Sequence, residues 1–170
     1  MESRRHAHVV NIDELEWQPG SEGERFASAR KRLAAAAGGA QIGCTLFEVP
    51  PGKRAFPFHS HSSNEESIYI LEGAGTLRLG ADQVKVRAGD YITMPAELEL
   101  AHQLINSGAA PLRYLCFSTM KLPEIVRYPD SGKLGMMTAA QGAPKDWPDF
   151  RGRAFLLLKE GASLDYYDGE

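Results

Sequence analysis

The chain has 170 residues, of which 43% are hydrophobic, and its formal net charge at pH 7 is −3. This length suffices for one domain with a hydrophobic core but not for two domains of ordinary size, so we expect a single domain. The basic cluster Arg30-Lys31-Arg32 is short and lacks interleaved aromatic residues, which argues against nucleic acid as a partner.

Two further features indicate the compartment. No run of about 18 apolar residues occurs, and the first six residues are polar with no apolar stretch behind them. We therefore expect a cytoplasmic protein with no membrane partner. The two cysteines, Cys44 and Cys116, stand singly in apolar, strand-like segments, so we interpret both as buried thiols rather than as a disulfide or metal ligands.

Residues 1–40 predict an arm that packs on the main domain. Residues 6–20 carry a short apolar patch and end at Pro19-Gly20, which fits an N-terminal strand or arm with Trp17 packed against the domain. Residues 23–37 have a composition that favours a helix, ended by Gly38-Gly39. Residues 26–33 could instead form an edge strand before a short helical turn.

Residues 41–121 predict the core of the domain. The expected strands, each bounded by Gly, Pro, Asp or Asn, cover residues 41–49, 55–61, 67–71, 76–79, 83–86, 91–94 and 112–119. This rhythm is typical of an all-β sandwich or barrel. The segment Gly73-Ala74-Gly75 lies between two expected strands and precedes no helix, so we interpret it as a hairpin turn rather than a dinucleotide-binding loop.

Residues 122–170 are expected to complete the same domain. Residues 122–148 contain several prolines and glycines and predict a long, mostly irregular excursion, a kind of segment that is often functional. Residues 154–159 predict one more strand.

Two histidines followed by a carboxylate form the most informative pattern. His59 and His61 are two residues apart, so on a strand both imidazoles point to the same face, and Glu66 can join them after a short turn. His102 offers a third imidazole farther along the chain. Three histidines and one carboxylate suit one divalent metal ion, such as Zn, Mn, Fe, Co or Ni.

These residues carry a resemblance to the cupin superfamily. The two matching stretches are Gly52 through His59, His61 and Glu66 to Gly73, which resembles the first cupin motif, and Gly89, Pro95, His102 and Asn106, which resemble most of the second. The spacing to Gly73 selects Glu66 over Glu65 as the ligand. The resemblance covers residues 41–119 and implies an all-β cupin barrel, that is, a double-stranded β-helix or jelly roll with short helical or irregular extensions.

The chain also resembles a group of small, single-domain bacterial cupins that are uncharacterised. The segments Asn64-Glu65-Glu66 and Gly89-Asp90-Tyr91 carry part of this likeness. Some members of the group have a provisional sugar-phosphate isomerase label, which rests on fold analogy and does not establish function. One departure from the family is the connection from Pro95 to His102, which is two residues longer and lacks a glycine. His102 keeps its place only if the extra residues bulge outward.

The predicted ligand set suits an open metal site. Three neutral imidazoles and one carboxylate leave a divalent ion with about one positive charge, and a six-coordinate ion keeps two positions for other ligands. We therefore expect a metal-dependent isomerase or dioxygenase that acts on a small polar, sugar-like or keto-acid-like metabolite. The catalytic residues are not identified, and the candidates for a base are Glu65, Tyr91 or a metal-bound hydroxide.

Two other functions stay open. The chain could be a non-catalytic sensor that binds a small molecule, or a structural dimer with an incidental metal. In each case we expect a homodimer, since small barrels expose sheet edges that need covering. The strand near Val9 and the aromatic C-terminal segment would form its interface.

Overall fold

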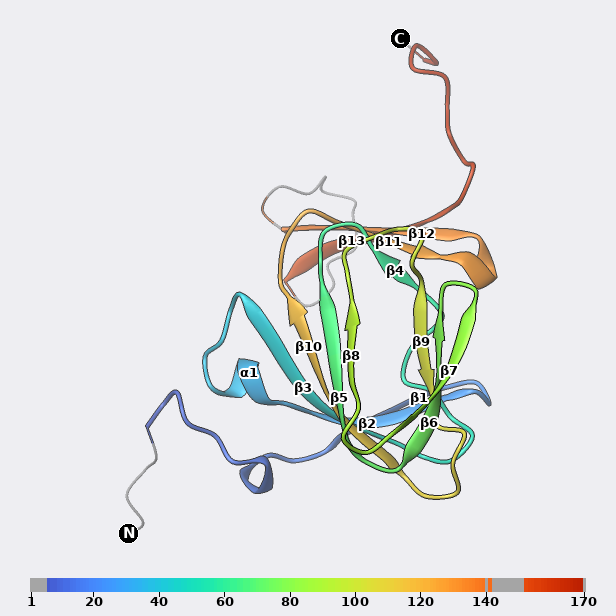
Figure 1. Cartoon of the computed structure of the whole chain (residues 1–170). Helices are drawn as coiled ribbons and strands as arrows, with labels where there is room; N and C mark the ends of the chain where they lie inside the picture. Colours follow the sequence, from blue (N-terminus) through green and yellow to red (C-terminus); the bar gives the residue numbers. More distant parts are fainter. Residues whose placement is uncertain (1–5, 140, 142–151, 170) are drawn as a thin grey trace.

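Antiparallel strands dominate the computed structural model, which describes residues 6–139, 141 and 152–169 (Figure 1). The strands are β1 (Gln18–Glu22), β2 (Phe26–Arg32), β3 (Ile42–Val49), β4 (Ser60–His61), β5 (Glu66–Glu72), β6 (Ala74–Leu79), β7 (Asp82–Arg87), β8 (Tyr91–Met94), β9 (His102–Ile105), β10 (Leu112–Thr119), β11 (Glu124–Tyr128), β12 (Lys133–Ala139) and β13 (Arg153–Lys159). The helices are η1 (Ile12–Glu14), α1 (Leu33–Ala36) and η2 (Pro129–Ser131). The predicted all-β class is confirmed.

The strands form three sheets. One has the order β1-β2-β3-β10-β5-β8, the second has the order β13-β12-β11-β4, and the third has the order β7-β6-β9. Figure 1 shows the first sheet facing the third, while the second crosses one end of the barrel. This end is where the predicted metal ligands meet, because β4 and the starts of β5 and β9 all lie there.

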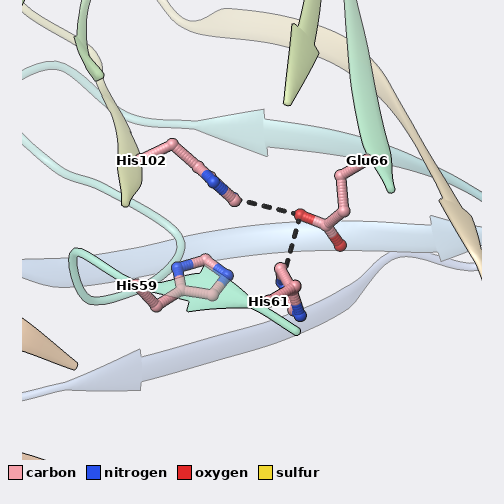
Figure 2. A group of neighbouring side chains, drawn as sticks. All are labelled: His59, His61, Glu66 and His102. Atoms are coloured by element: carbon pink, nitrogen blue, oxygen red, sulfur yellow. Dashed lines mark hydrogen bonds and ion pairs between the residues drawn. The ribbon is translucent and has the colours of Figure 1, made fainter. Parts of the chain in front are cut away.

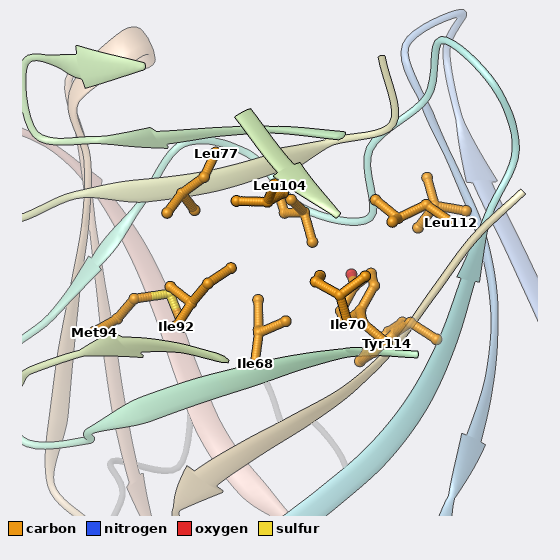
Figure 3. Close-up of a cluster of buried hydrophobic side chains, with 11 residues drawn as sticks. Ile68, Ile70, Leu77, Ile92, Met94, Leu104, Leu112 and Tyr114 are labelled. Carbon is orange, nitrogen blue, oxygen red and sulfur yellow. The ribbon is translucent and has the colours of Figure 1, made fainter. Parts of the chain in front are cut away.

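The hydrophobic core fills the space between the first and third sheets (Figure 3). Ile68 of β5 pairs with Ile92 of β8 on the inner face of the first sheet. Leu77 of β6 and Leu104 of β9 are also paired and face them from the third sheet. In β5 and β8 every second residue is buried along this stretch, as the alternation of side chains in a half-buried strand requires, whereas β6 and β9 bury consecutive residues.

In the N-terminal region, the alternative of an edge strand followed by a short helical turn is confirmed, and the strand expected near Val9 is wrong. Residues 26–32 form strand β2 and the helix is limited to α1, because pairing with β1 and β3 outweighs helix propensity. The segment around Val9 is not a strand. Trp17 packs as expected, with Lys31 Nζ 4.8 Å from the centroid of its ring.

The excursion predicted for residues 122–148 is wrong for its first half. Strands β11 and β12 pair as a hairpin, and β11 also pairs with β4. Pro129 begins the helical turn η2 between them and Gly132 ends it at a φ of +58°. Prolines and glycines thus mark the ends of these strands rather than interrupting them. Residues 142–148 lie outside the described part of the chain.

The hairpin turn predicted at Gly73 joins β5 to β6. Gly73 has a φ of +84°, and a Cβ atom there would lie 2.6 Å from the Pro111 carbonyl oxygen, so both the backbone and the space require glycine. Cys44 and Cys116 are free thiols in β3 and β10. Among the described residues, no helix has the length and apolar character needed to cross a membrane.

Candidate metal centre

Two chain segments bring the three predicted histidines together. His59 and His102 form an antiparallel bridge, in which each backbone N–H donates to the other carbonyl oxygen, at 3.1 and 2.7 Å. Their rings therefore lie side by side, with centroids 4.5 Å apart. His61 follows on the same face of the extended chain, and its ring centroid is 4.9 Å from that of His59.

Glu66 begins β5 and points at the histidines (Figure 2). Its Oε2 atom lies 3.2 Å from His102 Nε2 and 3.6 Å from His61 Nε2. Each of the four predicted residues offers one ligand atom, and these atoms all lie within 4.8 Å of one another. The structure therefore brings together the whole set proposed from the sequence, and its donors could hold one metal ion.

The long connection before His102 bulges outward, as the placement of this histidine requires. Glu97 and Glu99 are exposed, and Glu99 accepts a hydrogen bond from Arg127 Nη1 at 2.9 Å. Ser60 Oγ donates to the Leu98 carbonyl oxygen at 2.6 Å and so ties the connection to β4. The two extra residues therefore leave His102 at the site.

The ring of His59 is oriented by the backbone. Its Nδ1 atom lies 2.8 Å from the Pro57 carbonyl oxygen. Because that oxygen can only accept, Nδ1 carries the proton and Nε2 keeps a lone pair for a metal. Burial, together with the neighbouring His102 and His61, lowers the pKa of His59 to about 3. This imidazole is thus held in the neutral form that a metal ligand needs.

His61 and Glu66 form a charged pair in the metal-free protein. Burial disfavours the imidazolium, but the carboxylates of Glu124 and Glu66 outweigh burial and raise the pKa of His61 to about 9. Burial also disfavours the Glu66 carboxylate, but the hydrogen bond with His102 and the nearby cation of His61 outweigh burial, so the pKa of Glu66 lies well below its usual range. The imidazolium of His61 therefore balances the negative charge of Glu66 when no metal is bound, and a metal ion would take over that role.

Glu124 also lies at the cluster, and the sequence did not predict it there. It begins β11, is 2% exposed, and its Oε1 atom lies 3.8 Å from His61 Nδ1. The backbone N–H of Ser62 donates to the same oxygen at 2.8 Å. Glu124 thus stands behind His61, on the side away from Glu66. A carboxylate in that position orients a ligating histidine and raises its basicity.

Asn64 fixes the loop between β4 and β5. Its Nδ2 atom donates to Glu124 Oε2, and its Oδ1 atom accepts from the backbone N–H of Lys121 at 2.7 Å. The side chain is 8% exposed. The loop that carries the chain from His61 to Glu66 is therefore anchored to the segment before β11.

The chemistry of His61 fits a metal ion. Both of its ring nitrogens are buried, and neither has a hydrogen-bond partner among the described residues. Buried polar atoms are normally satisfied, since leaving them unpaired costs free energy. A divalent ion on Nε2, with the Glu124 carboxylate drawn to Nδ1, would satisfy both.

Other residues considered for the site lie away from it. Tyr91 is 65% exposed, and Glu65 is exposed. Each lies on the outer face of the sheet, because the residue that follows it in the sequence, Ile92 or Glu66, points to the inner face. Neither can act as a base at this site. Asn106 is fully buried and donates from Nδ2 to two backbone carbonyl oxygens, so its role is structural.

A cavity of about 520 Å³ adjoins the cluster. Glu66 lines it, together with the rings of Phe47 and Phe56 and the thiol of Cys116. The cavity lies between the first and second sheets, since Met137 of β12 lines its other side. Its volume suits a small metabolite.

Comparison with known sequences points to one domain type. The family model described as a cupin domain matches residues 45–118. An uncharacterised protein of Methanocaldococcus jannaschii is 39% identical over 70 residues, which are 41% of this chain and 54% of that protein. The quercetin 2,3-dioxygenase of Bacillus subtilis is 37% identical over 79 residues, which are 44% of this chain and 23% of that enzyme. The matched part thus spans about half of the first relative and less than a quarter of the second.

Solved structures extend the likeness to almost the whole chain. A sugar phosphate isomerase from a cupin superfamily, from Silicibacter pomeroyi, has a TM-score of 0.76 and 22% identity, over 94% of this chain and 98% of that one. At that identity the likeness shows the fold alone, and it includes the N-terminal region and the β11 to β13 sheet.

Proposed function

We propose that this chain, whose residues 45–118 match the cupin domain model and whose fold is that of a cupin structure, is a metal-dependent enzyme that acts on a small polar metabolite. The observation that carries the proposal is the convergence of His59, His61, Glu66 and His102 within 4.8 Å beside a cavity of about 520 Å³. One divalent ion held by these four side chains would supply Lewis-acid polarisation of a substrate carbonyl or, as iron, chemistry with O2.

The surrounding residues support a reactive site rather than a structural one. Glu66 lines the cavity, so a ligand there can reach the cluster. The barrel core on the other side is closed by apolar side chains such as Met94 and Leu77, which need no metal to pack. The chain's own contribution is to orient the donors, through Pro57 for His59 and through Glu124 for His61, and to enclose the substrate.

Two reaction types fit this site, an isomerisation and a dioxygenation. A curated relative is named a quercetin 2,3-dioxygenase and a structural neighbour a sugar phosphate isomerase, so neither name decides for this chain. The thiol of Cys116 faces the cavity, but burial raises its pKa well above the usual value, which keeps it protonated and makes it a poor base.

Activity assays with defined metals test the proposal. Protein loaded in turn with Fe(II), Mn(II), Ni(II) or Zn(II) would be assayed for O2 consumption with keto acids and for isomerisation of sugar phosphates. We expect turnover with at least one metal that is lost on chelation and restored by adding the same metal. Saturable ligand binding without turnover under any of these conditions would favour the sensor function instead.

We also propose that the protein is a cytoplasmic homodimer. The described C-terminal tail extends away from the barrel and exposes Leu164, Tyr166 and Tyr167, which a second chain could cover (Figure 1). Size-exclusion chromatography with light scattering is expected to give the mass of two chains. A chain shortened before Leu164 should shift toward the mass of one, and a full-length protein that already has the mass of one chain would contradict the proposal.

A further inference from the structure

The first sheet places two arginines on the same face as Glu66. Arg32 of β2 pairs with Thr45, Thr45 with Cys116, and Cys116 with Ile68 of β5. Side chains of directly paired residues lie on one face of a sheet, and Glu66 and Ile68 alternate onto the same face of β5. Arg32 therefore projects to the inner face that carries Glu66, and so does Arg30, two residues earlier.

A third arginine reaches the same space from the second sheet. Arg153 begins β13, and its Nη1 atom lies 3.6 Å from Met137 Sδ of β12. The cavity beside Glu66 is lined by Arg30, Arg32 and Arg153. Arginines of two different sheets thus line the space that adjoins the metal cluster.

The charge of this cavity is strongly asymmetric. Among its described lining residues, three are arginines and Glu66 is the one acid. Since Glu66 is already compensated by the histidines, and would be compensated by a metal ion, the cavity as a whole is electropositive. A cleft of one sign with low-dielectric walls, here Phe47 and Phe56, concentrates ligands of the opposite charge.

Other arginines of the protein are neutralised by its own carboxylates. Arg78 pairs with Asp130 at 2.8 Å, Arg113 with Glu48 at 2.6 Å, and Arg127 with Glu99 at 2.9 Å. For Arg32 and Arg153, the described part of the chain supplies no such ion pair, and the sulfur atom near Arg153 is a weak acceptor. Both side chains are half-buried, so an anion in the cavity would be their natural partner.

We infer that the cavity binds an anionic metabolite, whose terminal phosphate or carboxylate is held by Arg32 and Arg153 while its opposite end reaches the metal cluster at Glu66. This inference rests on the proposed function and adds the substrate class to it. Guanidinium forks bind carboxylate and phosphate oxygens in pairs, which makes arginine the fitting residue for either group.

The sheet also limits the length of the ligand. Strands β5 and β2 are separated by β10 and β3, which corresponds to about 14 Å between their backbones at ~4.8 Å for each step. The side chains of Glu66 and Arg32 extend into that space from both ends. The ligand that fits between them is therefore only a few carbon atoms long.

Three probes that share one metal-binding end test the inference. D-glycerate, D-3-phosphoglycerate and D-malate each carry a 2-hydroxycarboxylate of the same configuration, and they differ in having no second anion, a phosphate or a carboxylate. Their affinities for the metal-loaded protein would be measured by calorimetry. We expect 3-phosphoglycerate or malate to bind at least about tenfold more tightly than glycerate, and the stronger of the two identifies the anion.

Arginine variants assign that preference to the cavity. R32Q and R153Q should each reduce the preference by about tenfold or more, while glycerate affinity and metal content stay unchanged. The matched control is R87Q, which removes the same charge from the exposed end of β7 and should leave all three affinities alone.

The outcomes separate this inference from the proposed function. Equal binding of all three probes, or a preference that survives in both R32Q and R153Q, would overturn the anion site and leave the metal site standing. Failure of the wild-type protein to retain metal would overturn the proposed function. Failure of every probe to bind the metal-loaded protein would overturn the anion site.

Discussion

Replacement of His61 by alanine is expected to lower the affinity for a divalent metal ion by a factor of ten or more. The substitution removes one of four donors and leaves Glu66 without the imidazolium of His61, whose Nε2 atom lies 3.6 Å from Glu66 Oε2. Competition between the protein and a metal-binding dye gives the affinity directly for Zn(II), Mn(II), Ni(II) and Co(II).

The control for this experiment is Tyr69→Phe. Tyr69 is 40% exposed on the outer face of β5, so loss of its hydroxyl should not change metal affinity. Unchanged affinity in the His61 variant would refute the four-residue ligand set. Loss of metal in the Tyr69 variant would mean that the site lies elsewhere.

A second large effect is expected for Glu124→Gln, which should weaken metal binding by about 10-fold to 100-fold. The amide keeps the size of the side chain and can still accept from the Ser62 N–H, but it removes the negative charge 3.8 Å from His61 Nδ1. His61 then becomes a less basic and less firmly oriented ligand. The same dye competition measures the change.

Glu99→Gln is the matched control, because it makes the same chemical change at an exposed carboxylate in the connection before His102. Thermal unfolding of both metal-free variants shows whether folding is affected. If Glu124→Gln binds metal as tightly as the wild type and as Glu99→Gln, then Glu124 has no role in positioning His61.

The parts of the site that were predictable depend on short-range geometry. His59 and His61 are two residues apart, and the alternation of a strand alone puts their rings on one face. The choice of Glu66 over Glu65 came from its spacing to Gly73 in the family motif. Alternation agrees with it, since Glu66 shares the inner face with Ile68 and Glu65 does not.

The parts that were missed depend on pairing between distant strands. Glu124 reaches His61 only because β11 pairs with β4, and nothing near residue 124 indicates that partner. The strands β11 and β12 were hidden by the prolines and glycines around them, which mark strand ends as readily as they mark loops. Arg32 and Arg153 meet in one cavity through the registers of two different sheets, which a single sequence does not contain.

Elemental analysis of the protein purified without a chelator or a metal-affinity tag tests the central claim most directly. The four converging donors predict one equivalent of a single divalent metal for each chain, removed by chelation and regained on reconstitution. A chain that contains no metal, and takes up none from any of the divalent ions tested, would contradict the account.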